Sequence, residues 1–325
     1  MMGDGAGRDS FEVKVTRRCA EADDIDSFEL MRPDGRDLPP FSAGAHIDVL
    51  APNGMLRQYS LCNRPSERQR YVIGVLRDPR SRGASQSIHE LLAVGDMVRI
   101  GAPRNHFALA PAGRSLLLAA GIGVTPLMCM AEELHDAGAD FALHYCARSR
   151  RRTAFYAGLA RSEFGDHVHF HFDDEGEEQH LDLTALMARP DLETHVYVCG
   201  PAGFIDLVRS TAGAHGWHPW QIHVEHFRAL EQDLPEPGSF EVRIASSGKV
   251  VKVPANRNVA EVLAEQGIAI PVSCMEGVCG TCITRVLEGT PEHRDCYFSE
   301  EEKARNDLFM PCCSRSVSRT LVLDL

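Results

Sequence analysis

Six of the eleven cysteines lie in the last fifth of the chain, and three of these follow a metal-binding spacing. Cys274, Cys279 and Cys282 form the pattern C-x4-C-x2-C, and Cys312 follows after a further 29 residues. One loop can wrap three thiolates around a cluster while a fourth arrives from elsewhere, which is the plant-type arrangement for a 2Fe–2S centre. The spacing therefore predicts a 2Fe–2S cluster with Cys274, Cys279, Cys282 and Cys312 as its metal ligands.

A structural zinc site and unrelated buried thiols are the alternative interpretations of these cysteines. Zinc sites favour paired C-x2-C units, and no second unit of that kind is present. Cys313 stands next to Cys312, but two adjacent cysteines cannot both point the same way, and the 29-residue gap that ferredoxins share favours Cys312. We expect Cys313 to be a packed thiol and Cys296 to be incidental.

A second candidate site begins at Arg57-Gln58-Tyr59-Ser60-Leu61, at the end of an expected strand. An arginine can hold a phosphate with two hydrogen bonds. Tyr59 lies two residues later on the same strand face, where it can stack on an isoalloxazine ring, and Ser60 can donate a hydrogen bond near the flavin N5. Five residues alone also fit an ordinary exposed strand, so this motif needs support from elsewhere in the chain.

That support comes about twenty-five residues later, from a turn of small residues that opens a helix-like stretch. Backbone N–H groups at such a helix start bind phosphate. The flavin-binding candidates in this turn are Gly83, Ala84, Ser85 and Ser87.

Glycines after a buried strand at 116–119 predict a dinucleotide site. They would let a pyrophosphate approach the start of the next helix. The candidates there are Gly121, Gly123, Thr125 and Pro126. Cys199-Gly200-Pro201 ends a later strand of the same expected sheet, and Cys199 could lie beside a nicotinamide, which makes Cys199 and Ser60 the catalytic candidates. A structural corner and a buried structural cysteine are the alternatives.

The choice of nucleotide depends on opposing charges at two strand ends. Four arginines could bind the 2′-phosphate of NADPH: Arg148, Arg150, Arg151 and Arg152. Asp173 and Asp174 end the next strand, where a carboxylate accepts ribose hydroxyls and repels a phosphate. We favour NADH, with Asp173 as the cofactor-binding candidate. The nearby His167, His169 and His171 alternate with apolar residues, which favours a half-buried strand over a metal site.

These motifs need three kinds of fold to position them. Alternating strands and turns in residues 1–110 predict an antiparallel β-barrel for the flavin. Strands alternating with helices in residues 111–229 predict a doubly wound α/β domain for the nucleotide. A polar, Pro-rich stretch at 230–238 indicates a linker, and residues 239–325 would form a small ferredoxin domain. The expected fold class is therefore multidomain.

The charge balance and the distribution of apolar residues exclude some classes of function. The chain carries 46 acidic against 34 basic residues, a net charge of −12, which argues against nucleic acid as a partner. No apolar run reaches the length of a membrane span, and the first residues do not form a signal peptide. We expect a cytoplasmic protein whose thiols stay reduced.

Together these motifs resemble the phthalate dioxygenase reductase and vanillate O-demethylase reductase family, a branch of the ferredoxin–NADP reductase superfamily with a C-terminal ferredoxin. The matching patterns are R-x-Y-S-L, G-x-G-x-T-P, C-G-P and the cysteine set, in the family's order. Ala84 and Ala120 replace glycines of the family. Glu225 and Phe227 match the family's acidic–aromatic ending near the flavin.

The resemblance implies an enzyme with FMN, NADH and a 2Fe–2S cluster, a β-grasp-like ferredoxin domain and a monomeric state. It also implies a terminal oxygenase, of Rieske type, as the protein partner. Two alternatives remain at this point: a stand-alone NAD(P)H-dependent flavin or quinone reductase, and a redox sensor that signals through its cluster.

Overall fold

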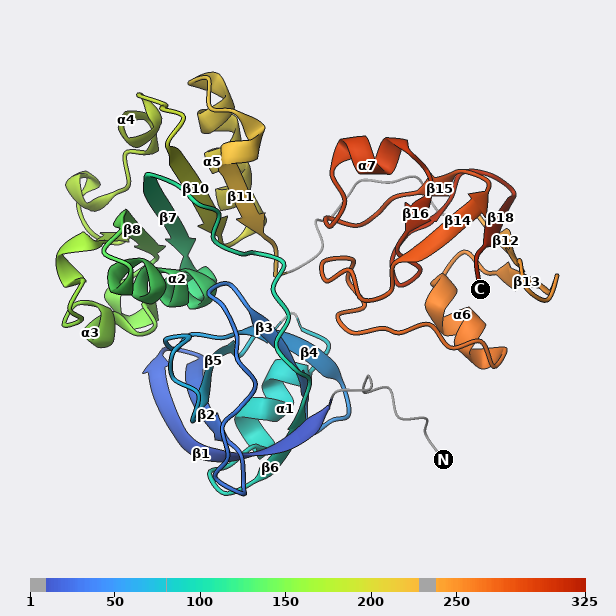
Figure 1. The fold of residues 1–325 in the computed structure, drawn as a ribbon, viewed down its shortest axis with the longest axis horizontal. Coiled ribbons are helices and arrows are strands. Elements are labelled where there is room, and N and C mark those ends of the chain that lie inside the picture. Colours follow the sequence, from blue (N-terminus) through green and yellow to red (C-terminus); the bar gives the residue numbers. More distant parts are fainter. Residues whose placement is uncertain (1–9, 80, 228–237) are drawn as a thin grey trace. The chain divides into compact units, whose positions relative to one another are not determined.

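The computed structural model describes residues 10–79, 81–227 and 238–325. The described residues form two compact units, one that ends at Glu225 and one that begins at His226 (Figure 1). Apart from Gly238, the linker predicted at 230–238 lies outside the described residues.

The first unit opens with a six-stranded antiparallel sheet in the order β4-β3-β6-β1-β2-β5. A bridge between Leu61 and Ile73 joins the two edges, so the sheet curls into a barrel. One helix, α1 (Ala84–Leu91), follows β5. The strands are β1 (Phe11–Ala22), β2 (Ile25–Met31), β3 (His46–Leu50), β4 (Leu56–Ser60), β5 (Tyr71–Leu76) and β6 (Met97–Ile100).

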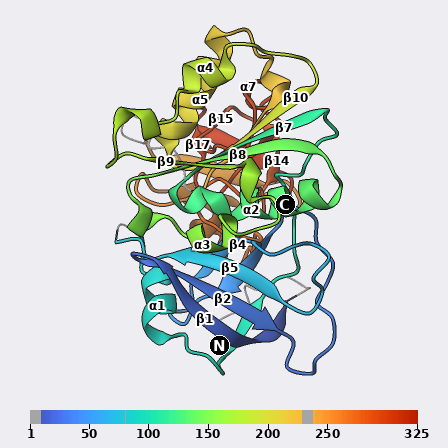
Figure 2. The same ribbon diagram turned by 90° about the vertical axis from the view of Figure 1, so that its left-hand side faces the viewer.

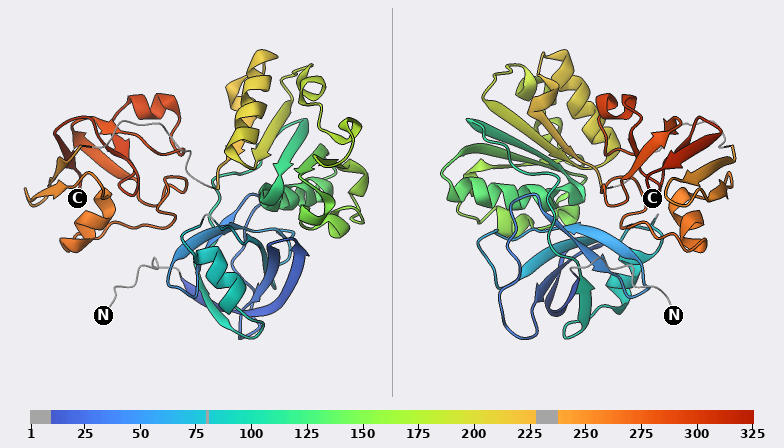
Figure 3. Two further views of the ribbon diagram at one scale, coloured as in Figure 1. Left: turned by 180° about the vertical axis from the view of Figure 1, so that it is seen from behind. Right: turned by 45° about the vertical axis from the view of Figure 1, so that its right-hand side comes forward.

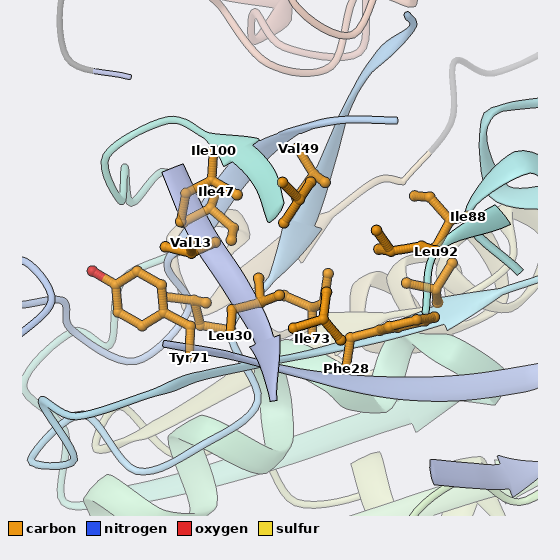
Figure 4. Close-up of a cluster of buried hydrophobic side chains, with 14 of the residues drawn as sticks. Val13, Phe28, Leu30, Ile47, Val49, Tyr71, Ile73, Ile88, Leu92 and Ile100 are labelled. Carbon is orange, nitrogen blue, oxygen red and sulfur yellow. The ribbon is translucent and has the colours of Figure 1, made fainter. Parts of the chain in front are cut away.

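The barrel core is built by side chains that alternate along the strands. On β2, Phe28 and Leu30 are buried on either side of the half-buried Glu29. Ile73 of β5 and Ile88 of α1 meet them in the interior (Figure 4). Each such apolar side chain stabilises the fold by roughly 1.5–3 kcal/mol on full burial.

The rest of the first unit is a parallel sheet in the order β11-β10-β7-β8-β9. Helices α4 and α5 pack on one face of it and α2 on the other, so its central strands β7 and β10 are almost entirely buried (Figure 2). The strands are β7 (Arg114–Ala120), β8 (Asp140–Ala147), β9 (Val168–Phe172), β10 (Thr194–Cys199) and β11 (Ile222–Glu225). The helices are α2 (Val124–Asp136), α3 (Tyr156–Leu159), α4 (Leu183–Met187) and α5 (Ala202–Ala214).

This strand order places a topological switch point between β7 and β10. From β7 the chain moves outward through β8 and β9, and then returns to β10 on the other side of β7. Ligands of open α/β sheets bind in the crevice beyond the carboxyl ends of the strands at such a point. The Gly121 turn and Cys199 stand at those ends.

The barrel and the parallel sheet are packed directly against each other. Arg64 of the barrel pairs with Glu132 of α2 at 2.8 Å, and the Ala43 N–H donates to Glu133 at 3.0 Å. Gly74 of β5 lies so close to Thr125 that a Cβ on it would meet the threonine Cγ2 at 2.9 Å. These contacts fix the flavin motifs relative to the nucleotide motifs.

The sequence predicts a helix around residues 153–164, and this prediction is wrong in its extent. Only α3, four residues long, forms there. Phe155 adopts a left-handed conformation with φ 60° immediately before it, and Thr153 turns its hydroxyl back to the Ser149 carbonyl. Gly158 and Ser162 are weak helix formers, so nothing local extends the turn.

The second unit contains a mixed sheet in the order β13-β12-β18-β14-β16, with β12 and β18 parallel, crossed by helix α6 (Figure 3). This is the β-grasp-like architecture expected for the ferredoxin region. Its larger strands are β12 (Phe240–Ile244), β13 (Val250–Val253), β14 (Thr284–Glu288) and β18 (Thr320–Leu323). The remaining elements are α6 (Val259–Glu265), β15 (Pro291–Glu292), α7 (Glu300–Ala304), β16 (Leu308–Phe309) and β17 (Arg315–Ser316).

Arg315 of β17 ties together the edge of this domain. Its side chain is buried, and it donates to the backbone carbonyls of Arg257, Gly238 and Pro254 at 2.7, 2.9 and 3.0 Å. The guanidinium also lies over the Phe240 ring, 5.2 Å from its centroid. Three chain segments therefore meet on one side chain.

Across the described ranges, every helix is too short or too polar to cross a lipid bilayer.

Candidate functional site

The four predicted cluster cysteines converge in the second unit. Cys274, Cys279 and Cys282 lie on the loop between α6 and β14, and Cys312 reaches them from the segment after β16. All four are buried. Cys274 is within hydrogen-bond distance of Cys279 and of Cys312, and Cys282 is within hydrogen-bond distance of Cys312. These contacts lower the pKa of Cys274 and of Cys282 and raise the pKa of Cys279 and of Cys312, because in each contact one thiol donates while the other accepts.

The cysteine loop is shaped by two glycines with left-handed backbones, at φ 75° for Gly277 and 70° for Gly280. A Cβ on Gly277 would meet the Cys313 sulfur at 2.5 Å, and one on Gly280 would meet the Tyr297 ring at 2.6 Å. The loop therefore folds tightly against two segments, one before α7 that carries Tyr297 and one after β16 that carries Cys313. Cys313 is half-buried, contacts Cys312 and packs on the loop backbone.

Two of the sulfurs take part in hydrogen bonds within the loop. The Glu276 N–H donates to the Cys274 sulfur at 3.3 Å, and Cys279 and the Thr281 hydroxyl are 3.2 Å apart. Within the described ranges, no three His, Cys, Asp or Glu side chains surround a point where one metal ion would sit. Four cysteines hold a 2Fe–2S cluster of the plant type, and these four thiols are joined by the contacts Cys274–Cys279, Cys274–Cys312 and Cys282–Cys312.

A buried carboxylate supports the cysteine loop from beneath. Asp295 is fully buried and accepts hydrogen bonds from the Phe298 N–H at 3.0 Å and the Ser314 hydroxyl at 3.2 Å. His293 Nδ1 lies 3.4 Å from the same carboxylate. Burial pushes the pKa of Asp295 up, but the hydrogen bonds from His293 and Phe298 outweigh it and lower the pKa overall. Asp295 is therefore a fixed anion under the loop.

In the first unit, β4 carries Arg57, Tyr59 and Ser60. Tyr59 packs on the barrel core, and its burial raises its pKa to about 12 despite the nearby Arg57, so it is a neutral aromatic surface. Ser60 is buried and pairs with His46 of β3.

The predicted phosphate turn forms the start of α1. Gly83 caps the helix in a left-handed conformation with φ 96°. Ser87 donates to the Ala84 carbonyl at 2.8 Å, and Ser85 accepts from the Asp78 N–H at 3.2 Å, so both hydroxyls hold the turn itself. A Cβ on Gly83 would lie 3.6 Å from the Asn53 amide, which places the turn between β3 and β4 beside the helix start. The two flavin motifs are therefore neighbours.

The nucleotide motifs meet at the switch point. A Cβ on Gly123 would lie 2.2 Å from the Cys199 carbonyl oxygen, and one on Gly200 would lie 2.8 Å from the Ala120 Cβ. Gly121 has a positive φ of 56° with open space around it. Thr125 is buried and donates to the Ile122 carbonyl at 3.0 Å. Pro126 and Pro201 flank this corner at the starts of α2 and α5.

Cys199 is completely buried in this structure. Burial raises the pKa of its thiol well above the ordinary value, and the Glu225 carboxylate raises it further. Cys199 is thus a neutral thiol rather than a nucleophile. Its neighbour in the β10–β11 register is Glu225.

Glu225 joins the flavin and nucleotide motifs. The Ser60 hydroxyl donates to its carboxylate, and its Oε2 atom is buried with no hydrogen-bond partner. Burial raises the pKa of Glu225 to about 8, and the Ser60 hydrogen bond opposes this shift. Phe227, two residues later, is half-buried. Ser60, Cys199 and Glu225 therefore gather where the barrel meets the switch point.

An open pocket of ≈ 460 Å³ lies beyond the carboxyl ends of β8 and β9. We call it the acidic pocket; its lining residues are Asp23, Ser149, Arg150, Arg151, Asp174 and Glu175. Asp173, the predicted ribose ligand, does not line it and instead lies near Cys146, whose pKa is raised to about 12 by burial and by this carboxylate. Arg148 and Arg152 are also outside the lining.

The histidines nearby form a stack. His144 Nδ1 lies 3.0 Å from His171 Nε2, and His169 stacks on His144 at 4.8 Å. His167 belongs to the short turn before β9, so it does not share the strand face that its spacing indicates.

Comparisons with known proteins agree with this arrangement. Residues 242–317 match the 2Fe-2S iron-sulfur cluster binding domain. Vanillate O-demethylase oxidoreductase of Pseudomonas sp. strain HR199 is 52% identical over 315 residues, which cover 97% of this chain and 99% of that protein. Phthalate dioxygenase reductase of Burkholderia cepacia is 40% identical over 315 residues, covering 96% and 97%. The chain belongs to the phthalate dioxygenase reductase family.

A solved structure of a phthalate dioxygenase reductase, described as a modular structure for electron transfer from pyridine nucleotides to [2Fe-2S], superimposes with a TM-score of 0.77. It is 39% identical and the match covers 97% of this chain and 98% of that one. The membership, the fold class and the assignment as an iron–sulfur flavoprotein oxidoreductase are thereby confirmed.

The residues present fit the groups that this family implies. For a flavin, the relevant atom is Oε2 of Glu225. It is buried beside Ser60 and has no hydrogen-bond partner within the protein. For the cluster, four buried thiols converge on a loop whose two glycines leave no room for a Cβ.

Sequence reasoning missed three residues that the structure brings to these sites. Asp295 lies under the cysteine loop, Asn53 lies beside the start of α1, and Glu175 lines the acidic pocket. Asn53 had a weak signal, since it precedes a glycine in a turn between strands. The other two carry no local signal, because their contacts depend on loops from different parts of each unit.

Proposed function

We propose that this chain takes electrons from NADH and passes them singly, through FMN and a 2Fe–2S cluster, to a terminal oxygenase as its reductase component. The observation that carries the proposal is the meeting of Ser60 and Glu225 at the switch point that also presents Gly123 and Cys199. A flavin supplies the chemistry that links a hydride donor to a one-electron acceptor.

Some flavin-binding residues contribute charge to the site, and others contribute its shape. Arg57 supplies a permanent cation for the FMN phosphate, and the N-terminus of α1 at Gly83 supplies backbone N–H groups. Tyr59 offers a neutral ring, because its pKa of about 12 keeps the phenol protonated. Ser60 holds its hydroxyl toward Glu225 and thereby orders both groups at the reacting edge.

The nucleotide-binding residues let a dinucleotide approach the protein backbone closely. Gly121 leaves the start of α2 open to a pyrophosphate, and Gly123 lets the end of β10 pack closely against that helix start. Cys199 contributes a small, neutral, buried group at the end of β10, which shields a nicotinamide from water without reacting with it. Glu225 completes this side of the site with a carboxyl that stays protonated up to pH of about 8.

The cluster residues Cys274, Cys279, Cys282 and Cys312 provide the exit for single electrons. A terminal oxygenase, of Rieske type, is the partner that these electrons serve. The net charge of −12 favours a partner that presents a basic surface. We further propose a cytoplasmic monomer with functional boundaries at 1–110, 111–229 and 239–325, which size-exclusion chromatography and limited proteolysis test.

The visible spectrum of the purified protein, recorded without oxygen before and after NADH, tests the proposal. We expect flavin and cluster absorbance together, and bleaching of both by NADH. In Cys279→Ser the cluster absorbance should disappear while NADH still bleaches the flavin. If NADH reduces the flavin of the intact protein but never its cluster, the chain is a stand-alone flavin reductase. A purified Rieske oxygenase reduced only in the presence of the intact chain would establish the partner.

A further inference from the structure

The guanidinium of Arg150 in the acidic pocket is already engaged on two sides. Its Nε donates to the Glu175 carboxylate at 2.8 Å, and its Nη1 donates to the Tyr156 hydroxyl at 3.2 Å. The guanidinium also lies over the rings of Phe172 and Tyr156, at 5.1 and 5.7 Å from their centroids. A side chain on the surface is thus held in one position by three neighbours.

This position matters because arginine binds a phosphate through a pair of adjacent nitrogens. A guanidinium offers two such edges, one that includes Nε and one that is formed by both Nη atoms. Glu175 occupies a nitrogen of the first edge, and the Tyr156 hydroxyl occupies a nitrogen of the second. A phosphate at either edge would therefore meet a nitrogen that already has a partner.

The other charges of the acidic pocket act in the same direction. Arg151 lies 3.5 Å from Asp23, and the Asp23 N–H donates to the Arg151 carbonyl at 2.9 Å. The lining holds three carboxylates and two guanidinium groups, a net charge of −1. The pocket therefore repels a dianion but offers oxygen atoms that accept hydrogen bonds from hydroxyls.

We propose that Glu175, by occupying Arg150, makes this enzyme select NADH against NADPH at the acidic pocket. The inference rests on the proposed function, since it assigns the adenosine end of the nucleotide to this pocket. Asp174 and Glu175 accept the ribose hydroxyls, whereas a 2′-phosphate would have to displace Glu175 from Arg150 and face the remaining carboxylates. The specificity residue is thus Glu175 rather than Asp173, which the end of β9 indicates from the sequence.

Adenosine nucleotides without a nicotinamide provide a binding test that does not depend on electron transfer. ADP and adenosine 2′,5′-bisphosphate would be titrated into the holoprotein by isothermal titration calorimetry. We expect Glu175→Gln to improve the affinity for the 2′-phosphate compound relative to ADP by roughly tenfold, the usual size of one close charge interaction near a surface. Glu177→Gln removes the same charge from an exposed position on the same loop, outside the pocket lining, and should leave this ratio unchanged.

Arg150 provides the second half of the test. In the double variant Arg150→Gln/Glu175→Gln the gain should disappear, because the released guanidinium is what binds the phosphate. A ratio that does not change in Glu175→Gln, or that changes equally in Glu177→Gln, would overturn the proposal. So would a gain that survives the loss of Arg150.

Steady-state kinetics separate this inference from the function on which it rests. If NADH bleaches the flavin of the wild type, the proposed function stands, and the ratio of kcat/KM for NADPH to that for NADH then tests Glu175 alone. We expect that ratio to rise by roughly tenfold in Glu175→Gln. Wild-type protein that NADH fails to reduce would contradict the proposed function, while the titrations would still report on the pocket.

Discussion

Gly123 lies against the end of β10 so closely that a Cβ placed on it would stand 2.2 Å from the Cys199 carbonyl oxygen and 2.7 Å from the Gly200 nitrogen. The backbone of Gly123 itself is ordinary, with φ −61°. The glycine is therefore required for proximity rather than for conformation, and it sets how tightly the two strand ends close around the switch point.

Replacing Gly123 by alanine should force these strand ends apart. We expect a loss of stability of about 1–3 kcal/mol, the usual cost of overpacking a rigid interior, together with a higher KM for NADH. Urea unfolding and initial-rate kinetics measure the two effects. Gly203→Ala is the matched control, because a Cβ at Gly203 in α5 meets nothing within 4 Å. Equal behaviour of the two variants would show that the contact does not constrain the corner.

The pKa of Glu225, raised by burial to about 8 from an ordinary value of 4.5, should make the flavin-free protein less stable as pH rises. Folding favours the protonated carboxyl, so its contribution is complete below about pH 4.5 and is lost as pH rises through about 8, at up to about 1.4 kcal/mol per pH unit. Glu225→Gln should flatten this dependence.

Tryptophan fluorescence during urea unfolding, from pH 5.5 to pH 8.5 or so, reports this change selectively. Both tryptophans, Trp217 and Trp220, belong to the same unit as Glu225. Histidines titrate in this range as well, so the informative quantity is the difference between wild type and variant. A difference that stays constant across the range would mean that Glu225 titrates near its ordinary pKa.

The adjacent cysteines of the second unit should behave differently when each is replaced by serine. Cys312→Ser removes one of the converging thiols, so we expect the loss of cluster absorbance and of about two iron atoms per chain. Cys313→Ser should retain both, because its sulfur packs on the Gly277 backbone. Iron analysis with the visible spectrum makes the measurement. Loss of iron in Cys313→Ser and its retention in Cys312→Ser would exchange the two assignments.

Sequence reasoning succeeded where the signal is local. The spacing of Cys274, Cys279 and Cys282 and the glycines at Gly121 and Gly123 each belong to one turn or loop, and the fold class and family that they predict are confirmed. The expected helix at 153–164 is shorter than its pattern indicates because Phe155 adopts a left-handed conformation and delays the start of α3, while its ring lies close to Gly74 of the barrel.

The parts that sequence could not provide are pairings between distant loops. Glu175 is bonded to Arg150 across 25 residues, and Ser60 reaches Glu225 from another part of the first unit. The first contact depends on the packing of two loops beyond β8 and β9, and the second depends on the packing of the barrel against the parallel sheet, so no single stretch of sequence encodes either. The individual flavin, nucleotide and cluster ligands stay predictions that the variants above test.

Arg315 has a practical consequence for anyone who separates the ferredoxin domain from the rest of the chain. One of its buried N–H groups is satisfied by the Gly238 carbonyl at 2.9 Å. A fragment that begins at residue 239 would lack this acceptor and leave a buried donor unsatisfied, a loss of about 1–3 kcal/mol. A fragment that begins at Gly238 or earlier keeps this carbonyl in the peptide bond to Ser239, so the isolated domain should start no later than Gly238.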